Sequence, residues 1–204
     1  MSVFRPGGLT LTERALALCR LPAGAAVLDV GCGDGDTVKY LRETKKLDAW
    51  GVDSGAFDNS GHHIKRASAE SLPFDDGSFD ALFCECVFSL VRGPREALRE
   101  FSRVLKSGGF LVMSDMYAQK RGCTFAGEVR RLYTKTELEN LLSQNGFEIS
   151  LFEDHQDEML TLAGQLIMDG GAEAFYRSMG GDRAAFKEAA CSYCLLTAAK
   201  GAAK

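Results

Sequence analysis

The sequence predicts an α/β protein in which helices cover both faces of one doubly wound, mostly parallel sheet. Short apolar runs alternate along the chain with longer segments of helical periodicity, as parallel strands and their crossover helices require. The first two runs end in glycines and in an acid, which is typical of the carboxyl edge of such a sheet. The seven expected strands lie in residues 26–30, 49–52, 63–66, 79–90, 110–114, 147–152 and 192–199, and the fourth of them is expected to end near Cys84-Glu85-Cys86.

The stretch from Ala26 to Asp53 organises the rest of the chain. A buried strand enters the turn 31–35, Gly-Cys-Gly-Asp-Gly, whose alternating glycines can adopt positive φ and leave room for a ligand. A helix then begins near Asp36, and the next strand ends at Asp53. This order predicts a nucleoside-binding site at the carboxyl edge of the sheet. The alternative is a glycine-rich turn that binds no ligand.

Helical periodicity places the remaining elements within a single domain that spans residues 1–204. A leading helix in residues 1–24, with Thr10 and Glu13 spaced as a capping box, either covers the site or is a surface extension. Two inserted helices are expected in residues 155–190, where they would form a cap. The other expected helices are residues 94–105 and 136–146.

Composition restricts the class of partner. The 204 residues include 24 Lys and Arg against 28 Asp and Glu, a net charge of −4 without a long basic run, so nucleic acid is not an expected partner. The sequence shows neither an 18-residue apolar run nor a secretory leader, which predicts a cytoplasmic protein without membrane association. Seven scattered cysteines indicate thiols rather than a disulfide framework. A monomer or homodimer is expected.

The glycine spacing distinguishes two nucleotide-binding families. A dinucleotide fingerprint needs a third glycine where Asp36 stands. The phrase LDVGCGDG instead resembles the first motif of the Rossmann-like (class I) methyltransferases that use S-adenosylmethionine, and FSRVLKSGGFLVMSD matches a later motif of that family. The resemblance covers about residues 20–152 and the last strand. It implies S-adenosylmethionine as cofactor and a last strand that is a reversed, antiparallel edge strand.

The resemblance also implies roles for single residues. The glycines of the turn would pass beneath the methionine part of the cofactor, Asp29 would support the turn, and Asp53 would hold the ribose hydroxyls, since one carboxylate can accept two hydrogen bonds. Residues 67–74 resemble the family's third motif, with Ser68 in place of the aspartate that receives the adenine amino group. The expected cofactor-binding residues are Asp29, Gly31, Cys32, Gly33, Asp53, Ser54, Ser68, Ala69, Glu70 and Cys84.

Methyl transfer to a small molecule is the expected reaction. It is an in-line displacement, so positioning matters most and a base is optional. The candidate bases near strand ends are Glu85, Asp115, Tyr117 and His155. A protein that binds S-adenosylmethionine without catalysis is the alternative.

Two cysteines suggest a special kind of acceptor. The segment from Cys84 to Asp115 resembles quinone-biosynthesis and arsenite methyltransferases, and the arsenite enzymes keep cysteines where Cys86 and Cys123 stand. These two would bind a thiophilic acceptor, with Cys84, Cys32 or an added small thiol completing the site. Simple packing is the alternative, because a cysteine in an apolar strand is usually a small hydrophobic residue. No metal site is expected.

Overall fold

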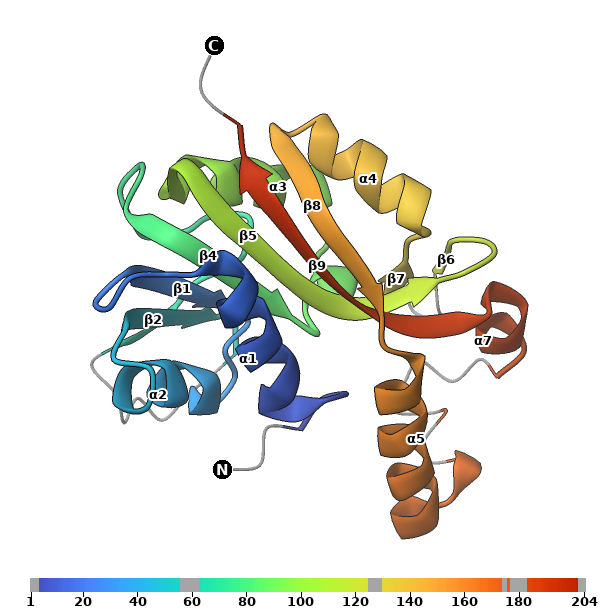
Figure 1. Ribbon diagram of the computed structural model, residues 1–204. Helices are drawn as coiled ribbons and strands as arrows, with labels where there is room; N and C mark the ends of the chain where they lie inside the picture. The colour runs from blue at the N-terminus through green and yellow to red at the C-terminus, as the bar shows by residue number, and fades with distance from the viewer. Residues whose placement is uncertain (1–3, 56–62, 125–129, 174–175, 177–182, 202–204) are drawn as a thin grey trace.

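The computed structural model describes residues 4–55, 63–124, 130–173, 176 and 183–201. A seven-stranded sheet in the order β3-β2-β1-β4-β5-β9-β8 forms its centre (Figure 1). The strands from β1 to β5 run parallel, and β9 is antiparallel to both of its neighbours, which confirms the predicted fold class. The strands are β1 (Ala26–Val30), β2 (Asp48–Asp53), β3 (Ile64–Arg66), β4 (Phe79–Glu85), β5 (Leu105–Ala118), β8 (Phe147–Asp154) and β9 (Cys191–Lys200).

The prediction of an edge position for the last strand is wrong. Strand β9 lies between β5 and β8, with hydrogen-bonded neighbours on both sides. Its residues from Ser192 to Ala198 are buried, as expected for a strand that is covered on both sides. Strand β8, whose residues are mostly half-exposed, forms this edge of the sheet instead.

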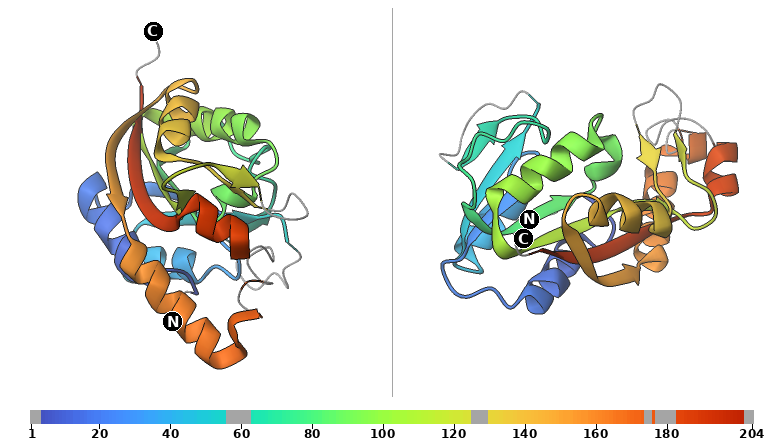
Figure 2. Two further views of the ribbon diagram at one scale, coloured as in Figure 1. Left: turned by 90° about the vertical axis from the view of Figure 1, so that its right-hand side faces the viewer. Right: turned by 90° about the horizontal axis from the view of Figure 1, so that it is seen from above.

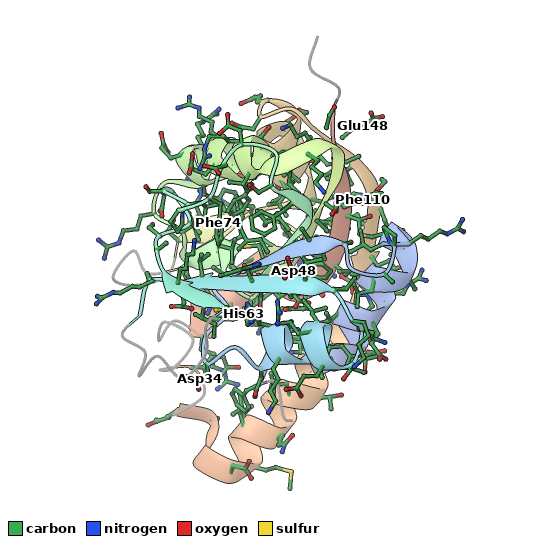
Figure 3. All side chains as sticks on the ribbon, turned by 90° about the vertical axis from the view of Figure 1, so that its left-hand side faces the viewer. Asp34, Asp48, His63, Phe74, Phe110 and Glu148 are labelled. Atoms are coloured by element: carbon green, nitrogen blue, oxygen red, sulfur yellow. The ribbon has the colours of Figure 1, made fainter. Side chains whose placement is uncertain are left out.

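The helices cover both faces of the sheet. They are α1 (Gly8–Cys19), α2 (Asp36–Glu43), α3 (Pro94–Val104), α4 (Lys135–Ser143), α5 (Gln156–Gly170) and α7 (Arg183–Ala189). Helices α1 and α2 lie on one face, while α3 and α4 lie on the other (Figures 1 and 2). Figure 3, viewed from the side of β3, shows Phe74 on the α3 side of the sheet and Asp34 on the α2 side.

Side-chain alternation along β1 builds both layers of the core. Leu28 and Val30 pack in the cluster that contains the α3 residues Leu98 and Phe101. Val27 points the other way and packs with α1 and α2. Burying one such aliphatic side chain contributes about 1.5–3 kcal/mol, so the strand is fixed in register by both faces at once.

One expected boundary is confirmed and another is wrong. Strand β4 ends at Glu85, as expected, because Cys86 adopts a left-handed φ of 64°, and a short 3-10 helix, η1 (Phe88–Leu90), follows in place of a further extended run. Cys84 and Cys86 therefore do not share one face of a regular strand. Strand β5 begins at Leu105 instead of residue 110, so residues 105–109 lie inside the strand, which has a bulge opposite residues 79–81.

The segment after β5 contains more order than its sequence suggested. Two short strands, β6 (Cys123–Thr124) and β7 (Arg131–Leu132), pair antiparallel there. Two helices of the described chain, α5 and α7, lie between β8 and β9, in the range where the inserted pair was expected, and their role as a cap stays a prediction. Helix α5 contains no buried residue and extends away from the sheet (Figures 1 and 2). Among the described helices, none has the length and apolarity that a membrane span requires.

The capping box occurs at another helix than predicted. Helix α1 begins at Gly8 without a side-chain cap, and Glu13 instead accepts hydrogen bonds from Tyr40 and Lys45. The expected Thr10 capping box is therefore wrong. Helix α4 has the box: the Thr134 hydroxyl accepts a bond from the amide of Glu137, whose carboxylate accepts one from the amide of Thr134.

Replacing the capping threonine should weaken the domain measurably. We expect Thr134→Ala to lower the free energy of unfolding by about 1 kcal/mol, because an amide at the start of α4 loses its acceptor. Thr136→Ala, at an exposed position of the same helix, is the matched control and should be nearly neutral. Equal losses in the two variants, measured by urea unfolding, would contradict the role of the cap.

Candidate cofactor and acceptor site

A cavity of about 460 Å³ lies at the carboxyl edge of the sheet, where β1, β2 and β4 end. We call it the carboxyl-edge cavity. Its wall combines one carboxylate at the end of β2 with apolar side chains from the segment after β4. The lining residues are Val30, Gly31, Asp53, Ser54, Ala67, Ser68, Ala69, Glu70, Val87, Leu90, Val91 and Arg92.

The glycine turn brings two segments into close contact. Gly31 has a φ of +75°, and a Cβ at this position would lie 2.2 Å from Cγ2 of Val87. Only glycine allows this approach, because any side chain would collide with Val87 and would adopt a strained conformation. The amides of Gly31 and Cys32 both donate to the carbonyl of Val52, at 2.7 and 3.1 Å, which ties the turn to β2.

Asp53 is positioned by the backbone of its surroundings. Its Oδ2 accepts a hydrogen bond of 3.0 Å from the Gly33 amide, and its Oδ1 accepts one of 2.8 Å from the Gly55 amide. Each carboxylate oxygen keeps a further lone pair, so the side chain can still bind two hydroxyls of a sugar. The carboxylate, the apolar wall and the open turn fit a nucleoside cofactor.

Ser68 and Glu70 form the other polar side of the cavity. The Ser68 hydroxyl donates to Glu70, and Oε1 of Glu70 accepts a bond of 3.1 Å from the Gly93 amide. The serine proton is thus used inside the protein, and its oxygen also accepts a bond of 3.4 Å from the Glu70 amide, which leaves one lone pair available to an amino group. This geometry is compatible with the expected contact to adenine.

The structure brings six of the ten expected cofactor-binding residues to this cavity: Gly31, Asp53, Ser54, Ser68, Ala69 and Glu70. The other four do not line it. Cys84 is fully buried in the core, and the sulfur of Cys32 lies 2.6 Å from the position that a Cβ of Gly51 would occupy. Gly33 contributes through its hydrogen bond to Asp53.

Sequence reasoning missed six lining residues: Val30, Ala67, Val87, Leu90, Val91 and Arg92. The last four belong to η1 and its flanks, a segment that follows the expected end of the fourth strand. The apolar character of this segment gave no signal of the left-handed residue at Cys86 or of the 3-10 helix after it.

Asp29 lies buried at the end of β1, with only 4% of its surface exposed. Burial, followed by repulsion from Glu85, raises the pKa of Asp29 from 3.8 to about 7. The site therefore contains a carboxyl group that resists ionisation, and Arg5 offsets only part of this effect.

Glu85 is held in a buried ion pair. Its Oε2 lies 2.6 Å from Nη2 of Arg5, and its carboxylate also accepts a bond of 3.0 Å from the Thr12 hydroxyl. Burial raises the pKa of Glu85, while Arg5 opposes this rise. Arg5 also donates to Thr37, at 3.2 Å, and so fastens the segment before α1 to the site. Sequence reasoning missed Arg5, because its partner lies 80 residues away along the chain.

The other candidate bases are also engaged in hydrogen bonds. Asp115 accepts bonds from the amide and hydroxyl of Ser89, at 2.7 and 2.9 Å. Tyr117 donates to Asp154, and its burial raises its pKa to about 12. His155 lies 3.4 Å from Glu153 and 3.2 Å from Glu158. Each predicted base is therefore occupied by neighbours in the protein.

Cys86 and Cys123 pack against the same small apolar cluster, which includes Met116 and Tyr193. Burial raises the pKa of Cys86 to about 11, which keeps its thiol protonated. Within the described part of the chain, no three His, Cys, Asp or Glu side chains are grouped so that they could hold a metal ion. Completion of a three-thiol site by Cys84 or Cys32 is therefore not supported, and the thiophilic acceptor stays a prediction.

A second cavity, of about 490 Å³, lies between α5 and the chain segment that leads into α1. We call it the amino-terminal cavity. Its lining residues are Phe4, Arg5, Gly7, Gly8, Asp157, Glu158, Thr161, Leu162 and Gln165. Since the guanidinium of Arg5 also reaches Glu85 and Thr37, this cavity lies next to the carboxyl ends of the central strands.

The contact between Gly31 and Val87 can be tested by a matched pair of variants. We expect Gly31→Ala to lower the free energy of unfolding by about 1–3 kcal/mol more than Gly33→Ala. Both glycines have positive φ, but a Cβ at Gly33 meets no atom within 4 Å. Thermal or urea unfolding measures the difference, and equal losses would show that the contact is unimportant.

The buried carboxyl group should leave a signature in the pH dependence of stability. The pKa of Asp29 is higher in the folded protein than in the unfolded chain, so the folded state binds more protons between about pH 4 and pH 7 and stability falls as the pH rises through this range. Asp29→Asn should therefore be more stable than the parent at pH 8, on the order of a few kcal/mol, with the gap closing toward pH 4. Asp34→Asn, at an exposed position of the same turn, is the control. A constant gap at every pH, measured by urea unfolding, would refute the assignment.

Comparison with known proteins agrees with the fold. Residues 28–113 match the family described as methyltransferase domain. The sarcosine/dimethylglycine N-methyltransferase of Halorhodospira halochloris is 29% identical over 72% of this chain and 60% of its own length. Phosphoethanolamine N-methyltransferase 3 of Arabidopsis thaliana is 25% identical over 76% of this chain and 35% of its own. The chain thus spans less than two thirds of these relatives.

Solved structures share the fold over nearly the whole chain. The [4+2]-cyclase SpnF has a TM-score of 0.75 at 24% identity and covers 95% of this chain and 81% of its own. Phosphoethanolamine N-methyltransferase 2 of Haemonchus contortus, solved with S-adenosylhomocysteine, has a TM-score of 0.73 at 16% identity and covers 96% of this chain and 53% of its own. Residues 28–113 thus match a methyltransferase domain, and solved methyltransferases that hold S-adenosylmethionine or S-adenosylhomocysteine share the fold of the chain.

Proposed function

We propose that this protein transfers a methyl group from S-adenosylmethionine to a small molecule. The observation that carries the proposal is the pairing of Asp53 with the glycine turn at the carboxyl-edge cavity. Asp53 would hold the ribose hydroxyls, Ser68 would receive the adenine amino group, and Val87 and Leu90 would contact the adenine ring. The bound cofactor supplies a methyl group on a positively charged sulfur, which needs only an aligned nucleophile.

The relatives favour a small acceptor. Their names refer to sarcosine, dimethylglycine and phosphoethanolamine, which are small amines. The amino-terminal cavity, with its volume of about 490 Å³, is of a size that suits such a molecule. We assign the acceptor to this cavity, so that the leading helix and the inserted cap would enclose it. The finer resemblance to quinone-biosynthesis or arsenite methyltransferases, a cytoplasmic location and a monomer or homodimer remain predictions.

A second candidate function is binding of S-adenosylmethionine without methyl transfer. Two observations favour it: each candidate base is engaged by neighbouring groups, and one structural neighbour is named a cyclase although it shares the fold. The two functions differ in their product. Only methyl transfer releases S-adenosylhomocysteine in proportion to an acceptor.

Asp53→Asn tests the cofactor site. We expect it to weaken binding of S-adenosylmethionine at least about tenfold, because hydrogen bonds to a charged acceptor contribute about 1.5–3 kcal/mol each. Asp48→Asn, at the exposed opposite end of the same strand, is the matched control and should bind like the parent. Calorimetric titration measures the affinity, and release of S-adenosylhomocysteine with a panel of small amines measures turnover.

The outcomes separate the candidates. Binding without turnover across the amine panel would favour the non-catalytic function. Equal affinity in the two variants, or no affinity in the parent, would contradict the assignment of Asp53 and of the carboxyl-edge cavity.

A further inference from the structure

We propose that the acceptor is a small zwitterion, with an ammonium group and an anionic oxygen group, held in the amino-terminal cavity between Arg5 and the first turn of α5. This inference rests on the proposed function and names its substrate class. The carbon chain of the acceptor would lie against the apolar members of the lining, and its two charged ends would face opposite walls.

The first wall contains a buried donor that has no acceptor. The Arg5 side chain is only 8% exposed, and its two terminal nitrogens donate to Thr12, Thr37 and Glu85. Its Nε is buried without a hydrogen-bond partner. Buried donors are nearly always satisfied, so this N–H indicates an acceptor atom supplied from outside the protein. Because Arg5 lines the cavity, a carboxylate or phosphate oxygen placed there is the group that fits.

The opposite wall is acidic. Asp157 and Glu158, in the first turn of α5, both line the cavity. Glu158 has a neighbour in His155, with Oε1 and Nδ1 3.2 Å apart, and the nearby Arg14 is paired with Glu153 at 2.7 Å. Among the described residues that line this cavity, Arg5 is the only Lys or Arg, and its charge is matched by Glu85. The wall therefore keeps a negative excess, which favours an ammonium group.

The remaining lining gives the ligand its size and its apolar part. Phe4 is 70% exposed, and Leu162 lies on the cavity face of α5. These side chains can cover a short carbon chain between the two charged ends. Figure 1 shows the segment before α1 directed toward the start of α5, so the two walls come from elements that flank the site from opposite sides.

The two charged walls also fix the orientation of the acceptor. Arg5 is bonded to Glu85 at the end of β4, so an acceptor held by Arg5 lies beside the carboxyl ends of the strands. The amine must lose one proton to water before its lone pair can accept a methyl group. Asp157 and Glu158 also stabilise α5 itself, because acids in the first turn of a helix interact favourably with the helix dipole. The test must therefore measure ligand binding and protein stability separately.

Three probes of similar size test the proposal by calorimetry, with the protein saturated by S-adenosylhomocysteine. β-Alanine carries both charges, propylamine carries only the ammonium group, and propionate carries only the carboxylate. Glycine and phosphoethanolamine extend the zwitterionic set. We expect at least one zwitterion to bind at least tenfold more tightly than both single-charge probes. If no zwitterion exceeds the single-charge probes, the proposal is wrong.

Variants assign the two walls. Asp157→Asn combined with Glu158→Gln should weaken binding of the zwitterion and propylamine but leave propionate unchanged. Arg5→Lys keeps a cation beside Glu85 but removes the Nε donor, and it should weaken the zwitterion and propionate. Asp169→Asn, exposed on α5 outside the cavity, is the control. Melting temperatures and S-adenosylmethionine affinity identify variants that merely fail to fold.

The two proposals fail in different ways. If S-adenosylmethionine binds and S-adenosylhomocysteine is released with other acceptors while no zwitterion is preferred, only the inference about the acceptor fails. If the parent protein does not bind S-adenosylmethionine, the proposed function itself fails. Identical losses for all three probes in both wall variants would show a general change of the cavity and would overturn the assignment of its walls.

Discussion

The close approach of Val87 to Gly31 is the constraint on which the site depends. It requires a turn without a Cβ after β1 and a chain reversal after β4, and the structure provides both: Gly31 has positive φ, and Cys86 has a φ of 64°. The reversal turns η1 back over the turn, so that Leu90 and Val91 line a cavity that opens on Asp53. A larger residue at position 31 would push the two segments apart and remove the apolar wall.

Buried charge is concentrated at the same edge of the sheet. Asp29 and Glu85 lie near each other in the core of the domain, and a single cation, Arg5, compensates them. Burial is the main reason why Asp29 ionises with difficulty, and the excess of two carboxyl groups over one guanidinium adds to this effect. A cationic sulfonium is well suited to such an environment. The same ion pair fastens the segment before α1, so the electrostatics of the site and the closure of its roof depend on one side chain.

The sequence predicted what is encoded locally. The apolar run of β1 and the acid at the end of β2 are short-range signals, and the structure reproduces these strands within a residue. The end of β4 near Glu85 was predicted, but the 3-10 helix that follows was not, because periodicity cannot show a left-handed residue such as Cys86. The place of β9 between β5 and β8, and the partnership of Arg5 with Glu85, are long-range pairings that no local pattern contains. For the site, the acid and the glycines could be predicted, whereas the wall formed by η1 could not.

The state of the candidate bases limits the chemistry of the site. Glu85, Asp115 and Tyr117 are buried, and each is hydrogen-bonded to neighbouring groups. Each would have to break these hydrogen bonds before it could remove a proton. An acceptor that exchanges its proton with water avoids this cost, and an amine in an open cavity does so readily. Catalysis would then depend on alignment of the nucleophile with the methyl group, which accounts for much of the rate in bimolecular reactions. On this view, the fixed Arg5 and the two acids of α5 contribute by positioning the acceptor, and the protein needs no strong base.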